Sequence, residues 1–255
     1  ANQKGGVGKT VSCVNLGIGL AQEGKKVLLI DGDMQLNLSL AFFPENWVLE
    51  QAKGEKNLYC AIGKQEELSG YVVHTPYENL DLIPSSTLMS SIEYELFTKW
   101  QREFILRKCI QKIKDAGNYD YILIDCMPSL GMITINAFAS ADSILIPVQA
   151  AYLPVKGLEQ LIKTIGKVKR QINPKLEIEG ILLTMVDNRT NYAKDISALV
   201  VENYGSKVRI FENSIPMSVR AAEISAEGVS IYEHDPNGKV ASAYQSLTEE
   251  VLADE

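Results

Sequence analysis

The sequence predicts an α/β fold, in which a mostly parallel, twisted sheet carries helices on both faces. Short apolar runs alternate along the chain with longer stretches whose apolar residues recur at helical spacing. A glycine-rich loop also stands directly before the first helical stretch. Strands that are separated by helices pair in parallel, and right-handed crossovers then place helices on both faces of the sheet.

The individual elements follow from these periods. Buried strands are predicted over residues 27–30, 80–83, 121–124, 143–148 and 178–184, with a weaker strand over residues 208–211. Helices are predicted over residues 11–23, 93–116, 155–171, 193–203 and 242–252. Gly24 is expected to end the first helix, because glycine favours the left-handed conformation that follows many helices.

The remaining stretches complete the expected architecture. Residues 43–77 are the least periodic, and we expect surface helices and loops there rather than a separate domain. The 255 residues are therefore expected to form a single domain. Because a glycine-rich loop of this kind normally follows a strand, a first strand is expected upstream of residue 1.

The composition is that of an ordinary globular protein, with 46% hydrophobic and 22% charged residues. The formal net charge of −7 does not favour nucleic acid over the whole molecule. The cysteines are scattered without a CxxC pair, so reduced thiols of a cytoplasmic protein are expected rather than a metal site or disulfides. No run of about 18 apolar residues and no signal peptide occur, so no membrane association is expected.

The most specific motif is the loop Lys-Gly-Gly-Val-Gly-Lys-Thr at residues 4–10, called the phosphate loop below. Its glycines let successive backbone N–H groups face phosphate oxygens, and the following helix adds its positive end. Lys9 is predicted to contact the β- and γ-phosphates of ATP, and Thr10 to bind Mg²⁺. A glycine-rich turn with a chance Gly-Lys-Thr is the alternative, which the helix and the downstream carboxylates disfavour.

Carboxylates follow two of the predicted strands. Asp31 and Asp33 come after residues 27–30, and Asp125 comes after residues 121–124. Because ligands bind beyond the carboxyl ends of parallel strands, these side chains are expected near the phosphate loop. We expect Asp125 to hold Mg²⁺ through water and Asp33 to orient or activate the attacking water. Asp31 is expected to support the metal shell or the loop. A single Asp after a strand could also cap a helix.

The phosphate loop departs from the general pattern GxxxxGK[ST], because Gln3 stands at the first glycine position and Lys4 adds a second lysine. In this it resembles the deviant Walker A class of ATPases, which includes the ParA/Soj partition proteins, MinD and the nitrogenase iron protein. The resemblance implies the three-layer P-loop NTPase fold. It also implies that Lys4 crosses a dimer interface to the partner's nucleotide, where the alternative is a solvated loop cation. The implied nucleotide contacts are Lys4, Gly5, Gly6, Val7, Gly8, Lys9, Thr10 and Val11.

Segments further along the chain extend the resemblance. Residues 31–37 are similar to the family's DxDPQxN element, and residues 125–131 to its DxPPSLG switch segment. Met34 and Met127 stand where proline is usual in these elements. Because the fixed φ of proline is lost at both positions, we expect these loops to be more mobile.

Later stretches favour the ParA/Soj branch of the class, namely residues 182–190, 215–220, 232–236 and 243–244. The resemblance implies contacts to the adenine side of the nucleotide near Asp187 and Pro216. It also implies contacts to non-specific DNA from Arg189 and Arg220. Surface salt bridges are the alternative for these arginines, and Met217 replaces an arginine that the family often has.

The resemblance implies an ATPase that forms a homodimer when ATP is bound, binds non-specific DNA and is stimulated by a ParB-like protein during plasmid or chromosome partitioning. Association with the nucleoid would follow from DNA binding. A related ATPase that positions a protein cargo or regulates cell division, as MinD does, is an alternative. An acidic stretch at residues 249–255 disfavours anchoring of the MinD type. A reductase component or biosynthetic ligase is a further alternative, although Cys126 lacks an evident second cysteine for a cluster.

Overall fold

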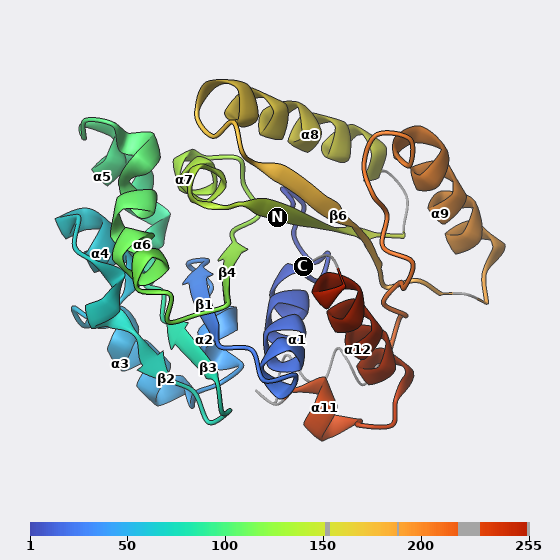
Figure 1. The fold of residues 1–255 in the computed structure, drawn as a ribbon, viewed down its shortest axis with the longest axis horizontal. Helices are drawn as coiled ribbons and strands as arrows, with labels where there is room; N and C mark the ends of the chain where they lie inside the picture. The colour runs from blue at the N-terminus through green and yellow to red at the C-terminus, as the bar shows by residue number, and fades with distance from the viewer. Residues whose placement is uncertain (151–153, 188, 219–229, 254–255) are drawn as a thin grey trace.

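The computed structural model describes residues 1–150, 154–187, 189–218 and 230–253. Parallel strands form its centre and helices cover both sides (Figure 1). Hydrogen bonds join the strands in the order β2-β3-β1-β4, and β5 pairs with β6. The pairing of β2 with β3 is antiparallel. The strands are β1 Val27–Gly32, β2 Val73–His74, β3 Leu80–Ile83, β4 Tyr121–Cys126, β5 Ser143–Gln149 and β6 Glu177–Thr184.

The main predicted strands are confirmed, and β1 and β4 run slightly further than the apolar runs indicated. β1 includes Asp31 and β4 includes Asp125, and these two residues stand in register. The weak strand expected over residues 208–211 is reduced to a bridge between Ile181 and Ile210. Two backbone hydrogen bonds, from Ile181 N–H to the Arg209 carbonyl (2.9 Å) and from Phe211 N–H to the Ile181 carbonyl (3.0 Å), hold it against β6.

Helices pack on both faces of the strands because the strand residues are apolar on both faces. Along β1, Val27 and Leu29 face the core that contains the first and last helices, whereas Leu28 and Ile30 face the core of α4, α6 and α7. None of the helices within the described ranges is long and apolar enough to cross a membrane. The α-helices are α1 Lys9–Gln22, α2 Asn37–Leu40, α3 Glu45–Lys53, α4 Leu58–Lys64, α5 Ile92–Phe97, α6 Ile105–Ala116, α7 Met132–Ser140, α8 Pro154–Gln171, α9 Asn191–Tyr204, α11 Ile231–His234 and α12 Lys239–Leu252.

The single helix predicted over residues 93–116 is wrong, because α5 and α6 are separate helices with a short 3-10 turn, Arg102–Phe104, between them. The chain breaks at Gln101, whose φ of 51° is left-handed and cannot continue a right-handed helix. Phe97 and Trp100 are 73% and 87% exposed, so these two aromatic side chains gain little from burial, whereas Ile105 and Ile113 of α6 are buried. Helical spacing alone did not reveal that these aromatic side chains face solvent.

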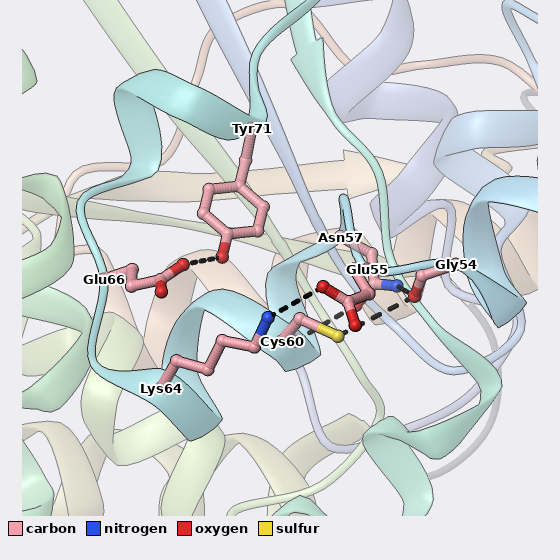
Figure 2. Close-up of polar contacts among 7 residues, drawn as sticks. All are labelled: Gly54, Glu55, Asn57, Cys60, Lys64, Glu66 and Tyr71. Carbon is pink, nitrogen blue, oxygen red and sulfur yellow. Dashed lines mark hydrogen bonds and ion pairs between the residues drawn. The ribbon is translucent and has the colours of Figure 1, made fainter.

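The aperiodic stretch over residues 43–77 forms α3, α4, a 3-10 turn and the short edge strand β2. Asn57 organises it, because its Oδ1 accepts from Cys60 N–H (3.0 Å) at the start of α4 while its Nδ2 donates to the Gly54 carbonyl (2.9 Å). Figure 2 shows this cap beside the ion pair of Lys64 with Glu55 and the hydrogen bond from Tyr71 to Glu66. The side-chain cap satisfies a backbone donor that the helix itself leaves unpaired.

Helix α1 is held in place by the end of the chain. As expected, it stops before Gly24, whose φ of 80° is left-handed. The Ser12 hydroxyl lies 3.2 Å from the Tyr244 hydroxyl of α12. A Cβ added to Gly19 would lie 2.3 Å from the Thr248 hydroxyl, so the two helices approach too closely there for any larger residue. This packing fixes the helix that begins at the phosphate loop.

Candidate functional site

The phosphate loop, residues 4–10, lies at the carboxyl edge of the strands and leads directly into α1. Gly6 and Gly8 have φ values of 70° and 82°, a conformation that side chains with a Cβ rarely adopt. The carbonyl of Val7 accepts a 2.9 Å hydrogen bond from the Thr184 hydroxyl at the end of β6. The loop is therefore tied to the sheet behind it, and its turn leads to the positive N-terminus of a 14-residue helix.

Lys9 and Thr10 begin that helix and lie on the side of the carboxylates. The Lys9 ammonium donates to the Lys4 carbonyl across the loop at 2.9 Å. Burial lowers the pKa of Lys9, and the neighbouring carboxylates of Asp125 and Asp33 oppose that shift. The Thr10 hydroxyl donates a 2.6 Å hydrogen bond to Asp125 Oδ2. The motif and the strand-end carboxylate that the sequence associated with it are thus in direct contact.

Asp125, at the end of β4, is almost fully buried and only 3% exposed. Burial raises its pKa to about 6, although the hydrogen bond from Thr10 favours the charged form. A buried carboxylate under this penalty gains from a nearby cation. A hydroxyl and a carboxylate oxygen are also donors of the kind that Mg²⁺ prefers. The residues present therefore fit a magnesium ion held between them and phosphate oxygens.

Asp33 and Asp31 lie on the neighbouring strand β1 and the turn that follows it. Asp33 is 8% exposed and accepts a 3.1 Å hydrogen bond from Gln35 N–H. Asp31 is fully buried, and it accepts from Asp33 N–H (3.2 Å) and from both the N–H (3.0 Å) and the hydroxyl (2.6 Å) of Ser39. Burial raises the pKa of Asp31 to about 7. Its contacts hold the turn that carries Asp33.

Lys4 stands exposed at the outer side of the loop. Its ammonium lies 3.5 Å from Oε1 of Gln149, the last residue of β5. Gln149 and Thr184 are contacts that the sequence reasoning missed. Both are polar residues at the carboxyl ends of buried strands, which is the same signal that identified Asp31 and Asp125. The side chain of Val11 is partly buried and packs against the core beneath α1.

A second part of the site is built by β6 and the chain that runs beside it. Val186 and Pro216 form a parallel bridge, with hydrogen bonds from Val186 N–H to the Ile215 carbonyl and from Met217 N–H to the Val186 carbonyl, both 3.1 Å. This pairing brings Asp187 next to Pro216. The two residues predicted to lie on the adenine side are therefore neighbours, although they are distant in sequence.

The predicted DNA-binding residue Arg189 lies on the same turn as Asp187. It is largely exposed, and its guanidinium forms a forked pair with Asp187, at 2.8 Å from Nε and 3.0 Å from Nη2. The structure thus joins a residue predicted for the nucleotide to one predicted for DNA, in a surface salt bridge of the kind considered as the alternative. Arg220 lies outside the described residues.

Comparison with known proteins adds to this geometry. The model of a family described as an AAA domain matches residues 1–178. Soj, the sporulation initiation inhibitor protein of Bacillus subtilis (strain 168), is 40% identical over 252 residues, which are 99% of this chain and 96% of Soj. The chromosome partitioning protein ParA of Caulobacter vibrioides (strain NA1000 / CB15N) is 36% identical over 255 residues, 100% of this chain and 93% of ParA. The chain belongs to the ParA/Soj family.

The similarity of the ParA/Soj chain to solved structures agrees with the fold inferred from the sequence. Cobyrinic acid a,c-diamide synthase from Mycobacterium smegmatis, with bound ATP analog and magnesium, superposes with a TM-score of 0.86 at 28% identity, covering 99% of this chain and 92% of the synthase. The expected P-loop NTPase fold is confirmed.

Proposed function

We propose that this ParA/Soj-family chain is a Mg²⁺-dependent ATPase that works as a switch in the partitioning of plasmid or chromosomal DNA. The proposed ATPase activity rests on the 2.6 Å hydrogen bond between Thr10 and Asp125 at the N-terminus of α1. This bond supports the proposal because Thr10, the proposed Mg²⁺ ligand, and Asp125, proposed to hold Mg²⁺ through water, lie beside glycines and a lysine that suit phosphates. Full-length similarity to proteins named for chromosome partitioning supports the cellular role.

Each residue of the site takes a defined role in this proposal. The backbone of residues 5–8 and the Lys9 ammonium bind the phosphates, with Val11 adding a backbone contact. Thr10 and, through water, Asp125 hold Mg²⁺, which neutralises phosphate charge when bound. Asp33 orients the water that attacks the γ-phosphate, so that ATP and water give ADP and phosphate. Asp187 and Pro216 contact the adenine side.

The switch rests on a homodimer that forms around ATP. Lys4 is exposed in the phosphate loop, and its ammonium lies at a long 3.5 Å from Oε1 of Gln149. Its charge can therefore leave this position for a second nucleotide at little cost. In the dimer each Lys4 contacts the nucleotide of the partner subunit, and hydrolysis removes the γ-phosphate that both subunits share. A ParB-like protein stimulates that step.

DNA binding in the proposal uses Arg189 and Arg220 and requires ATP. Contacts of this kind go to phosphates, so binding is independent of base sequence and weakens steeply with salt. An alternative within the family is a switch that positions a protein cargo or regulates cell division. The pairing of Arg189 with Asp187 and the net charge of −7 favour this alternative, because both reduce the positive charge offered to DNA.

One experiment separates these functions. Binding of a random-sequence DNA duplex is measured by gel shift with ATP, with ADP and without nucleotide, across a salt series, while phosphate release is followed in parallel. The DNA-partitioning switch requires ATP-dependent binding that falls with salt. ATP hydrolysis without DNA binding supports the cargo-positioning switch. Lys9→Ala serves as the nucleotide-blind control, and ATP binding by that variant equal to wild type contradicts the assignment of the phosphate loop.

A further inference from the structure

The chain at residues 208–217 runs beside β6 but leaves it part of the way along. Before the departure, Phe211 N–H donates to the Ile181 carbonyl at 3.0 Å. After it, Ile215 N–H donates to the Leu183 carbonyl at 2.8 Å. The residues between Phe211 and Ile215 step away from the sheet, so their backbone N–H groups need partners from elsewhere.

Glu250 of α12 supplies partners for two of these residues, Glu212 and Asn213. Its Oε2 accepts from Glu212 N–H at 3.0 Å, and its Oε1 accepts from both the N–H (3.0 Å) and the side-chain amide (2.8 Å) of Asn213. Arg209 adds a longer ion pair of 3.5 Å. A carboxylate that accepts backbone N–H groups forms stronger hydrogen bonds than a neutral acceptor does. One side chain thus clasps Glu212 and Asn213, the first two residues that depart from the sheet.

The position of Glu250 in its own helix supports this reading. It lies in the last turn of α12, where the negative end of the helix dipole disfavours a carboxylate. Its side chain is 14% exposed, which adds a desolvation cost. The N–H groups of the departing chain offset both costs. Glu249, the preceding residue, is exposed and makes none of these contacts, so it is a matched control.

The clasped chain leads directly to the adenine side of the site. Shortly after Asn213, Ile215 and Pro216 rejoin the sheet and pair with Val186. The position of Pro216 is therefore set from two sides, by the backbone of β6 and by the clasp of α12. The phosphate loop lies at the other end of the site and is anchored by Thr184, not by Glu250.

We infer that Glu250 is a positioning residue that sets Pro216 against the adenine side of ATP, an inference that rests on the proposed function. Glu250 affects the affinity for the base of ATP and not the binding of the phosphates by the phosphate loop. Its loss therefore raises the KM for ATP and leaves kcat unchanged. Inorganic tripolyphosphate, which carries the phosphates of ATP without the base, is bound as well by a Glu250 variant as by wild type.

The test compares Glu250→Gln and Glu250→Ala with Glu249→Gln. Calorimetry measures binding of Mg²⁺ with ATP and, separately, of Mg²⁺ with tripolyphosphate, and steady-state assays give KM and kcat. We expect Glu250→Ala to weaken ATP binding about tenfold and Glu250→Gln, which keeps one acceptor oxygen, about threefold. Tripolyphosphate affinity and kcat stay at wild-type values, and Glu249→Gln changes neither ligand. A Pro216→Gly variant combined with Glu250→Gln loses less than the two separate losses together, because both act on one contact.

The outcomes are distinct. Equal loss of ATP and tripolyphosphate affinity overturns the inference in favour of a general structural role, and unchanged ATP affinity overturns it outright. If Glu250→Ala does not fold, Glu250→Gln still decides. If wild-type protein binds neither ATP nor tripolyphosphate, the proposed function itself is wrong, whereas wild-type binding with an indifferent Glu250→Gln refutes only the role of Glu250.

Discussion

The hydroxyl of Thr10 and the carboxylate of Asp125 are joined by a 2.6 Å hydrogen bond although 115 positions separate them in sequence. The bond crosses from the first turn of α1 to the end of β4. The fold therefore holds together two oxygen donors that suit Mg²⁺. Such preorganisation reduces the free-energy cost of ordering the site when nucleotide and metal bind.

Substitution of Thr10 tests this pair. Thr10→Val keeps the shape of the side chain but removes the hydroxyl, so the gain in ATP affinity that Mg²⁺ provides should fall at least about tenfold, the typical loss from removing one group that holds or orients a metal. Thr10→Ser keeps the hydroxyl and is the control. A magnesium titration of ATP binding measures the effect. Equal Mg²⁺ dependence in the two variants would show that the hydroxyl is not a ligand.

The two lysines of the phosphate loop should separate binding from dimerisation. Lys9→Ala should abolish detectable ATP binding, because it removes the charge that faces the phosphates from the same subunit. Lys4→Ala should bind ATP within a few-fold of wild type but remain a monomer. Sedimentation velocity with ATP measures the second effect. An ATP-bound dimer of Lys4→Ala would mean that Lys4 is only a solvated cation of the loop.

Asp33 should control turnover and not affinity. Asp33→Ala removes the proposed water-orienting carboxylate, so phosphate release should slow by about 100-fold or more, the usual contribution of such a group. ATP binding should persist, and the ATP-bound dimer should accumulate. Phosphate release and sedimentation of the same sample check both parts. Normal turnover would assign the attacking water to another residue.

Substitutions of Arg189 and Asp187, which form a salt bridge, should have opposite effects on DNA affinity. Arg189→Ala should weaken ATP-dependent DNA binding and reduce the slope of log affinity against log salt by about 1, as expected for one lost phosphate contact. Asp187→Asn should strengthen DNA binding at saturating ATP, because it removes a competing anion. Gel shifts across a salt series measure both. If neither variant changes DNA affinity, the pair is a surface salt bridge without a role in DNA binding.

Because of Asp31, the free energy of unfolding should decrease as pH rises. Burial raises its pKa from an ordinary value of 3.8 to about 7, so the folded protein holds a proton that the unfolded chain releases within this range. Its contribution to the free energy of unfolding is therefore present below pH 3.8 and is lost as pH rises to about 7. Asp31→Asn cannot ionise and should show a flatter dependence. Urea unfolding between pH 4 and pH 8 measures this.

The control for Asp31 is Asp115→Asn, at an exposed position of α6. It should leave the dependence of stability on pH as it is in wild type. Parallel curves for wild type and Asp31→Asn would contradict the raised pKa of Asp31.

Much of the architecture could be predicted because it depends on local patterns. The strand cores follow from uninterrupted apolar runs, and the contact of Thr10 with Asp125 follows from the rule that parallel strands end at one edge. The break at Gln101 could not be predicted, since Phe97 and Trp100 fit helical spacing whether or not they are buried. The clasp by Glu250 was equally hidden, because an acidic residue in a C-terminal helix resembles any solvated charge until the chain it meets is known.

The pairing of Arg189 with Asp187 illustrates a different limit. Family resemblance assigned these residues to separate partners, and the salt bridge considered as the alternative for Arg189 did not identify Asp187 as its partner. Contacts within one turn are short-range in sequence. Even so, they depend on the φ and ψ of the turn, which residue types alone do not determine.

The packing of α12 on α1 has a consequence for how the chain folds. Ser12 and Tyr244, which touch in the finished fold, are 232 positions apart. The phosphate loop and the helix that supports it are therefore far apart in sequence. Long-range contacts of this kind slow folding, because a long loop must close before they form. The support of α1 by α12 is therefore expected to form late in folding, and until α12 docks the apolar face of α1 stays exposed.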